Sequence, residues 1–389
     1  MNCHERTAIA LNLGIPDRVP VFSCTEEQNQ IYEILGEKDQ AVALSLVQEG
    51  WTGKLFKLAA PLANRIGWFN RETEKFMSKK LEADIALGYD CSWLMYSAIF
   101  KLKGNRQATD IWGKLYDLVA DPDGNVDTPM YRQGLLTTPE LWETWHHPDP
   151  DRFYKTLYRV FADLQKRYGG RIYLMGSLFS GLWESASQAM GLTAFSVTLR
   201  RNPDFVRRMV KYYETIYLAT IHATADAGMP AFVYSDDMGH KIGPQTSPRV
   251  LDEFFGPSLR RITEEAHKRG IKIIIHSCGN VNQLLDLFAD WGFDGVHALE
   301  PTAGIDLAVV KKQLGKRMCI FGNLDISHVL SQGTREEVEA AVKTALQAAA
   351  QDGGFIMAMT NSHNAVKVEN TRWMIEYTHR YGVYPITAD

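Results

Sequence analysis

Short apolar runs alternate with longer amphipathic stretches along most of this chain. Each run is continuously apolar and bounded by turn-forming residues, a pattern typical of strands that helices bury on both faces. Helical patterns separate most of the runs: apolar positions recur three and four residues apart in Pro203–Ala227, and Ser247–Lys268 opens on a Ser-Pro N-terminal signal. Eight runs have strand character: Val19–Ser23, Cys91–Tyr96, Ile172–Gly176, Ala231–Ser235, Lys272–His276, Gly295–Ala298, Met318–Gly322 and Phe355–Met359.

Eight strands in alternation with helices predict an α/β protein built as a (β/α)8 TIM barrel. An open, doubly wound sheet is the alternative that the same alternation permits. The chain shows no internal repeat at solenoid periods and no linker-like composition. Residues 1–389 are therefore expected to form a single barrel domain.

Two segments of the chain are not accounted for by the eight-stranded barrel. Residues 1–85 carry one candidate strand and several helices, including Gln40–Glu49 and Asn70–Leu87. They predict a mainly helical N-terminal extension that caps the bottom or side of the barrel. Residues 105–136 predict an inserted β-hairpin, because two apolar stretches flank the turn sequence Asp121–Asn125.

The composition narrows the function classes. The chain has 389 residues, of which 45% are hydrophobic and 23% charged, and its net charge of −4 argues against a nucleic-acid-binding protein. No apolar run approaches the roughly 20 residues that span a bilayer, and the N-terminus lacks the apolar stretch of a signal peptide. Five scattered cysteines suggest reduced thiols. We therefore expect a cytoplasmic enzyme that acts on a small molecule, without a membrane or nucleic-acid partner.

Polar and reactive side chains follow the predicted strands. In a TIM barrel the chemistry gathers at the C-terminal strand ends and in the loops that follow them. The same placement would also arise if these loops only faced water. The residues at these positions are Cys24, Tyr96, Ser177, Tyr234, Asp236, Asp237, His276, Cys278, Asn280, Glu300, Asn323, Asp325, Asn361 and His363.

An H-x-C pair, His276 and Cys278, follows the most apolar strand. An imidazole and a thiolate two residues apart can converge on one borderline cation, and Zn²⁺ is the cation that this pair predicts. The structural alternative is a buried, hydrogen-bonded histidine beside an inert cysteine. A catalytic zinc needs about three protein ligands and an open position. The spacing leaves several candidates for the third ligand: His363, Asp236, Asp237, Glu300 and Cys24.

Asp236 and Asp237 are adjacent, and adjacent residues at a strand end tend to point to opposite sides. At most one of them is therefore expected to face the cavity, where it could bind a metal, anchor a substrate or act as an acid or base. The other use of such a carboxylate is to cap the next helix or pair with a basic side chain. Asp325 has the same ambiguity, while Asn323 stands next to Gly322, where the backbone can approach a ligand.

With these motifs in place, the sequence resembles the uroporphyrinogen decarboxylase superfamily and, within it, the cobalamin-dependent methyltransferase branch. The resemblance covers most of the chain and is clearest from about residue 170. Near the start, ALNLGIPDRVP fits the opening phrase of the family. The other blocks that carry it are MGSLFSGLWESASQAMG at 175–191, YSDDMGHKIGPQTSPRVLDEFFGPSLRRI at 234–262, HKRGIKIIIHSCGNVNQLLDLFADWGFDGVHALEP at 267–301, GNLDISHVLSQGTREEV at 322–338 and GGFIMAMTNSHN with VEN at 353–370.

The resemblance separates the two branches of this superfamily. Its decarboxylases resemble one another in an Arg-rich segment after the first strand, which grips the carboxylates of the tetrapyrrole. This chain has no arginine between Arg18 and Arg65 and places Glu26 and Glu27 there instead. Porphyrinogen decarboxylation is therefore not expected.

The methyltransferase branch implies a zinc ion held by an H-x-C pair and by a later cysteine on the last strand. His276 and Cys278 match the pair, but Phe355–Asn364 contains no cysteine. Either His363 or a carboxylate replaces that ligand, or the zinc is absent.

The resemblance thus implies a methyltransferase that moves a methyl group between a corrinoid, free or on a carrier protein, and a small molecule such as a methoxylated compound, which it would demethylate. The rival functions are a decarboxylase or related lyase, and a non-catalytic module that binds a corrinoid or tetrapyrrole. Dimerisation is expected from the family alone. The expected metal ligands are His276, Cys278 and His363; the catalytic candidates are Asp236, Asp237, Glu300 and Asp325; and the substrate-binding candidates are Tyr96, Ser177, Tyr234, Asn280, Asn323 and Asn361.

Overall fold

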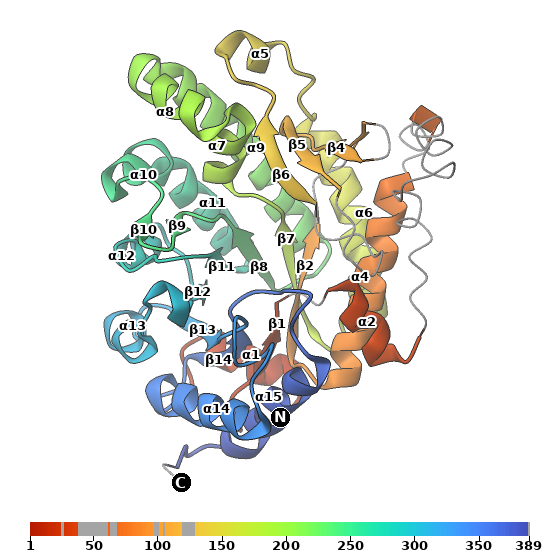
Figure 1. The fold of residues 1–389 in the computed structure, drawn as a ribbon, viewed down its shortest axis with the longest axis vertical. Helices are drawn as coiled ribbons and strands as arrows, with labels where there is room; N and C mark the ends of the chain where they lie inside the picture. Colours follow the sequence, from red (N-terminus) through yellow and green to blue (C-terminus); the bar gives the residue numbers. More distant parts are fainter. Residues whose placement is uncertain are drawn as a thin grey trace.

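The eight apolar runs form the eight strands of one closed parallel barrel (Figure 1). The computed structural model describes residues 1–24, 27–37, 61–62, 68–96, 101–103, 106–118 and 129–387. Strand β1 (Val21–Ser23) pairs with both β2 (Cys91–Tyr96) and β14 (Phe355–Met359), which closes the sheet and excludes the open, doubly wound alternative. The predicted TIM barrel is confirmed. The other barrel strands are β7 (Tyr173–Leu178), β8 (Ala231–Ser235), β11 (Lys272–Ser277), β12 (Gly295–Ala298) and β13 (Cys319–Leu324).

Helices surround the barrel and connect its strands (Figure 1). Within the described part of the chain, no helix is long and apolar enough to cross a membrane. The helices are α1 (Cys3–Leu11), α2 (Gln28–Leu35), α4 (Trp68–Leu87), α5 (Pro139–Glu143), α6 (Pro150–Tyr168), α7 (Leu182–Met190), α8 (Leu192–Arg201), α9 (Pro203–Asp226), α10 (Pro248–Phe254), α11 (Gly256–Lys268), α12 (Leu285–Asp290), a 3-10 turn (Pro301–Ala303), α13 (Leu307–Leu314), α14 (Arg335–Ala349) and α15 (Val368–Tyr381).

The predicted helix Pro203–Ala227 is α9, but the single helix expected over Ser247–Lys268 is wrong. The helix is interrupted at Phe255, so that α10 and α11 are separate helices. Pro257 explains the break, because a proline has no N–H to continue a helix and is tolerated only in its first turn. It occupies the first turn of α11.

The N-terminal part and the insertion both extend the barrel. The helix expected over Asn70–Leu87 lies within α4, whereas Gln40–Glu49 and the turn Asp121–Asn125 lie outside the described residues. The predicted hairpin is β5 (Lys114–Asp117) paired with β6 (Met130–Gly134). The structure adds two strands that the sequence pattern did not predict, β3 (Lys101–Leu102) and β4 (Gln107–Thr109), so the insertion is a four-stranded antiparallel sheet. A further short hairpin, β9 (Gly239–His240) and β10 (Gly243–Pro244), follows β8.

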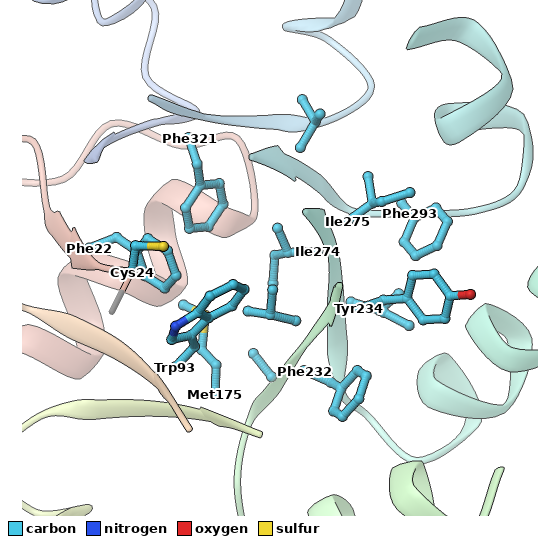
Figure 2. Close-up of a cluster of buried hydrophobic side chains, with 14 of the residues drawn as sticks. Phe22, Cys24, Trp93, Met175, Phe232, Tyr234, Ile274, Ile275, Phe293 and Phe321 are labelled. Atoms are coloured by element: carbon cyan, nitrogen blue, oxygen red, sulfur yellow. The ribbon is translucent and has the colours of Figure 1, made fainter. Parts of the chain in front are cut away.

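Side chains alternate between the barrel interior and the surrounding helices along each strand. On β2, Ser92 points outward, where its hydroxyl donates to Asp84 on α4, and its neighbour Trp93 points inward. Figure 2 shows Trp93 among other buried apolar side chains of the barrel, including Phe22 and Phe321. The rings of Phe22 and Phe321 meet edge to face at 5.3 Å. These aromatic side chains fill the barrel beneath the strand ends that carry the candidate site.

The opposite, N-terminal end of the barrel is held by a buried carboxylate at the start of β2. Asp90 accepts hydrogen bonds from Arg6 on α1 at 2.7 Å and from Arg18 at 2.7 and 3.0 Å. It also accepts the backbone N–H of Val21 at 3.0 Å. Two guanidinium groups and a strand N–H therefore satisfy a carboxylate that is almost fully buried. The contact joins α1, β1 and β2 where the barrel closes.

We expect Asp90→Asn to destabilise the protein by about 3 kcal/mol, because the uncharged amide leaves the largely buried Arg6 and Arg18 without their shared counter-charge. The shift in the urea unfolding midpoint measures this effect. Asp163→Asn is the matched control, since Asp163 forms only an exposed i,i+4 pair with Arg167 and its loss should leave the midpoint nearly unchanged. Equal shifts for the two variants would show that the Asp90 cluster contributes no more than a surface pair.

Candidate functional site

The ends of β8 and β11 bring three metal-ligating side chains together. The donor atoms of Asp237, His276 and Cys278 all lie within 4.8 Å of one another. His276 Nε2 is 3.4 Å from Cys278 Sγ and 3.8 Å from Asp237 Oδ1. His276 is the register partner of Ser235 in β8, so the residues two positions further on, Asp237 and Cys278, meet just beyond the strand ends. The backbone N–H of Cys278 donates to Asp237 Oδ1 at 2.8 Å, which holds the carboxylate against the H-x-C turn.

This donor set fits a zinc ion. An imidazole nitrogen, a thiolate and a carboxylate oxygen are all zinc ligands, and three protein ligands with an open position are typical of catalytic zinc. Burial lowers the pKa of His276 to about 4, so the ring is neutral at physiological pH and can offer a lone pair. Burial raises the pKa of the Cys278 thiol, and the nearby carboxylates of Asp237 and Glu300 raise it further. The thiolate form of Cys278 therefore needs a cation beside it.

A second histidine, His297, lies under the H-x-C pair and was missed by the sequence analysis. It is the register partner of His276 on the neighbouring strand β12, and the two Nδ1 atoms are 2.6 Å apart. Its Nε2 is 2.9 Å from the carbonyl oxygen of Met359 at the end of β14. Within the apolar run GVHA it resembles an ordinary strand residue. The alternation of β12, which turns this position toward the barrel interior, was the signal that could have found it.

Asn361 and Glu300 contact the Cys278 turn from two further strand ends. Asn361 Nδ2 donates to Cys278 Sγ at 3.0 Å, and Glu300 Oε1 accepts the backbone N–H of Gly279 at 3.1 Å. Gly279 has φ +82°, and a Cβ there would come within 2.7 Å of the Gly239 carbonyl carbon. Only glycine therefore allows this close passage.

Asp236 points to the opposite side of β8 from Asp237. Its carboxylate accepts the backbone N–H groups of Trp183 and Glu184, both at 2.9 Å, and the hydroxyl of Tyr234 at 3.0 Å. It therefore caps the N-terminus of α7, where a carboxylate also meets the positive end of the helix dipole. Asp236 and Tyr234 are fully buried outside the barrel interior and do not join the metal-ligating group.

Several other predicted site residues already have their polar groups satisfied. Asp325 accepts the backbone N–H groups of the turn that follows it, from Ser327 at 2.9 Å and His328 at 2.8 Å. Ser177 is fully buried and donates to the carbonyl oxygen of Val233 at 2.7 Å. Tyr96 differs from these two: it shares its side of β2 with the outward-facing Ser92, and its buried hydroxyl has no hydrogen-bond partner among the described residues.

The remaining candidates lie around the cluster of Asp237, His276 and Cys278 or further from it. Asn280 Oδ1 accepts the N–H of Asn282, and Asn323 Nδ2 donates to the Leu299 carbonyl at 2.9 Å, so both amides bind backbone groups near the strand ends. Cys24 is buried at the end of β1. His363 is exposed, its Nδ1 accepts the N–H of Ala365 at 3.0 Å, and it lies outside the metal-ligating group.

A buried carboxyl of α7, Glu184, also touches Asp237 and was not anticipated. Glu184 Oε2 accepts the backbone N–H of Asp237 at 3.3 Å. Burial and the neighbouring Asp237 raise the pKa of Glu184 to about 8, against the opposing effect of Lys114. Lys114 comes from the inserted sheet, is fully buried and donates to Ser180 Oγ at 2.5 Å and Gln188 Oε1 at 3.2 Å. The insertion is thereby tied to the helix that lies against Asp237.

Comparisons with known proteins identify the family and the fold of the chain. The family model described as uroporphyrinogen decarboxylase (URO-D) matches residues 120–381. The chain is 23% identical over 184 residues to the methylcobamide:CoM methyltransferase MtaA of Methanosarcina barkeri, which is 47% of this chain and 52% of that protein. It is 25% identical over 218 residues to the methylcobamide:CoM methyltransferase MtbA of Methanosarcina mazei, covering 55% of this chain and 61% of that protein.

A uroporphyrinogen decarboxylase of Mannheimia succiniciproducens is 21% identical over 242 residues, which is 60% of this chain and 66% of that protein. The chain thus spans between about half and two thirds of the length of these relatives. A solved methyltransferase from Methanosarcina mazei has the same fold, with a TM-score of 0.69, 16% identity and coverage of 98% of this chain and 99% of that one.

The family match covers more than half of the chain, and two of the relatives are named as methylcobamide:CoM methyltransferases, which is the branch that the sequence motifs indicated. The resemblance stated from the sequence is therefore confirmed. This chain belongs to the uroporphyrinogen decarboxylase family.

Proposed function

We propose that this protein is a corrinoid-dependent methyltransferase that uses a metal site made by Asp237, His276 and Cys278. The observation that carries the proposal is the convergence of these three donors at the strand ends of the barrel. The names of the methylcobamide:CoM methyltransferase relatives support methyl transfer to or from a corrinoid. A small methylated compound and a corrinoid, free or on a carrier protein, are the proposed reactants.

Asp237 takes the place that the resemblance gives to a late cysteine. The last strand offers no thiol, and His363, the histidine that follows it, faces solvent. The carboxylate of Asp237 instead approaches from β8 and is already held by the Cys278 N–H. A zinc ion bound by the three side chains would act as a Lewis acid toward the heteroatom that carries the methyl group.

The proposed reaction balances as a transfer of a methyl cation equivalent. In the demethylating direction the carbon–heteroatom bond would break, the heteroatom would gain a proton, and a corrinoid in its Co(I) state would supply the electron pair that accepts the methyl group. Glu300 is the acid–base candidate for that proton, because its carboxylate lies against the Cys278–Gly279 turn. Asn280, Asn323 and Asn361 are the candidates that would orient the substrate, since their amides stand at the same strand ends.

Decarboxylation of a porphyrinogen is disfavoured by charge. Between Arg18 and Arg65 the chain has no arginine to pair with the carboxylates of such a substrate. The side chains that converge on the site among the described residues include two carboxylates, Asp237 and Glu300. A polyanionic substrate would meet repulsion there, whereas a neutral or cationic methyl compound would not.

We expect the purified protein to bind about one zinc ion per chain, and Asp237→Ala to weaken zinc binding by more than tenfold, because a three-ligand site loses one donor. His276→Ala and Cys278→Ala should do the same. His363→Ala is the matched control and should bind zinc like the wild type, since His363 lies outside the group. Metal analysis by mass spectrometry after dialysis, followed by chelator competition, measures the affinities. Loss of zinc in His363→Ala with retention in Asp237→Ala would replace our ligand set with the one that uses His363.

We expect the zinc-loaded protein to convert cob(I)alamin to methylcob(III)alamin with at least one donor from a panel of methoxylated aromatic compounds and methylamines. The visible spectrum of the cobalamin follows the reaction, and demethylated product should form in equal amount. Removing the metal with a chelator, or substituting Cys278→Ala, should reduce the rate by at least about a hundredfold, a loss of more than roughly 2.7 kcal/mol of transition-state stabilisation. Release of CO2 from uroporphyrinogen without any methyl transfer would contradict the proposal and favour the decarboxylase alternative.

A further inference from the structure

The buried pair of His276 and His297 defines a chain of hydrogen bonds under the candidate metal site. His276 Nδ1 faces His297 Nδ1 at 2.6 Å, and His297 Nε2 faces the Met359 carbonyl oxygen at 2.9 Å. The free end of the chain, His276 Nε2, lies 3.4 Å from Cys278 Sγ. The chain therefore runs from the backbone of β14, through β12, to the donor atom of β11.

The direction of the protons in this chain follows from the chemistry of its last member. A carbonyl oxygen can only accept, so the hydrogen between His297 and Met359 is on His297 Nε2. A neutral imidazole carries one N–H, which leaves a lone pair on His297 Nδ1. The contact of 2.6 Å between the two Nδ1 atoms then requires the hydrogen on His276 Nδ1. His276 Nε2 consequently carries a lone pair and points it at the cluster.

The apolar surroundings of His297 offer no counter-charge for a protonated ring. Phe22 meets His297 edge-on with ring centroids 5.3 Å apart, and Trp93 lies 5.1 Å from the ring of His276. Phe321 lies beside Phe22, with its ring centroid 6.4 Å from that of His297. Among the described residues, no carboxylate forms a hydrogen bond or ion pair with His297. A charged imidazolium at His297 would therefore have no compensating charge, and a missing acceptor would leave the buried N–H of His276 without a partner.

We propose that His297 is a positioning residue that fixes His276 in the Nδ1–H tautomer and so sets the metal affinity of the site. The inference rests on the proposed metal site of Asp237, His276 and Cys278. A partner of this kind orients a metal-binding imidazole and fixes its tautomer, and its loss in other proteins costs about 10- to 100-fold in metal affinity. The end of β14 contributes twice: the Met359 carbonyl accepts from His297 Nε2, and Asn361 Nδ2 donates to Cys278 Sγ.

Two substitutions at position 297 separate positioning from packing. His297→Leu removes the acceptor, whereas His297→Gln keeps an oxygen that can accept from His276 Nδ1 and an amide that can donate to Met359. We expect His297→Leu to weaken zinc or Co²⁺ binding by about 10- to 100-fold. We expect His297→Gln to stay within about threefold of the wild type. Competition with a chromophoric chelator measures the affinities, and thermal unfolding of each metal-free variant measures the effect on stability.

His379→Leu is the control for replacing a buried imidazole elsewhere. His379 on α15 has a buried Nε2 without a hydrogen-bond partner and lies near Gly88, away from the candidate site. The His379→Leu substitution should change the unfolding temperature without changing the metal affinity. Equal metal affinity in His297→Leu and the wild type, or an equal loss in the His297→Leu and His297→Gln variants, would overturn the proposed role.

The tautomer itself is observable without metal. Nitrogen-15 NMR of the metal-free wild-type protein should show His276 protonated at Nδ1 and His297 at Nε2. In His297→Leu the His276 signal should move toward the Nε2–H form. Detection of His276 as the Nε2–H tautomer in the wild type would refute the proton arrangement, even if His297→Leu fails to fold. If the wild type binds no metal, the proposed function loses its metal site, while this spectrum still decides whether His297 orients His276.

Discussion

In a closed parallel barrel every second side chain of a strand points inward, and the register between neighbouring strands decides which of these side chains meet. The pairing of His276 with Ser235 and with His297 sets the whole candidate site. It places His297 beside His276 within the barrel, and Asp237 beside Cys278 one step above. A shift of one residue in β8 would put either Ser235 in the place of Asp236, with loss of the cap of α7, or Met238 in the place of Asp237, with loss of the third donor.

The polar groups of the site are ordered from the apolar layer upward. Phe22, Trp93 and Phe321 exclude water from the two histidines, so each N–H must find a protein partner. The partners are fixed backbone and ring atoms, which leaves His276 with one outward lone pair. Above this level the thiol and the carboxylates are more accessible, where a substrate can reach them. A preorganised metal site requires this arrangement: buried ligands with fixed hydrogen bonds below, and solvent-accessible groups above whose hydrogen bonds can be exchanged for contacts with substrate.

The barrel could be predicted from the sequence because a continuous apolar run marks each strand as buried, as in Lys272–Ser277. The sequence predicted the H-x-C pair because the two residues are only two positions apart, at the end of one strand and in the turn that follows it. The sequence left the third ligand open, because Asp236 and Asp237 differ only in the side of β8 that each one faces. Which side each faces depends on where the strand ends. The sequence pattern missed His297, whose role depends on a register partner 21 residues away in the chain. Asp325 shows the opposite case, a carboxylate whose partners are the N–H groups of its own turn.

The exchange of a late cysteine for Asp237 has a chemical consequence for the proposed reaction. Aspartate and cysteinate carry the same charge, so one neutral histidine, one thiolate and one carboxylate still balance a Zn²⁺ ion. The carboxylate oxygen is a harder donor than a thiolate and passes less electron density to the metal. A site with one thiolate is therefore a stronger Lewis acid than a site with two. Such a site is better suited to polarise an ether or amine that must release its methyl group than to keep a bound thiol nucleophilic. The proposed chemistry therefore favours a methyl donor as the small-molecule substrate, rather than a thiol that accepts the methyl group.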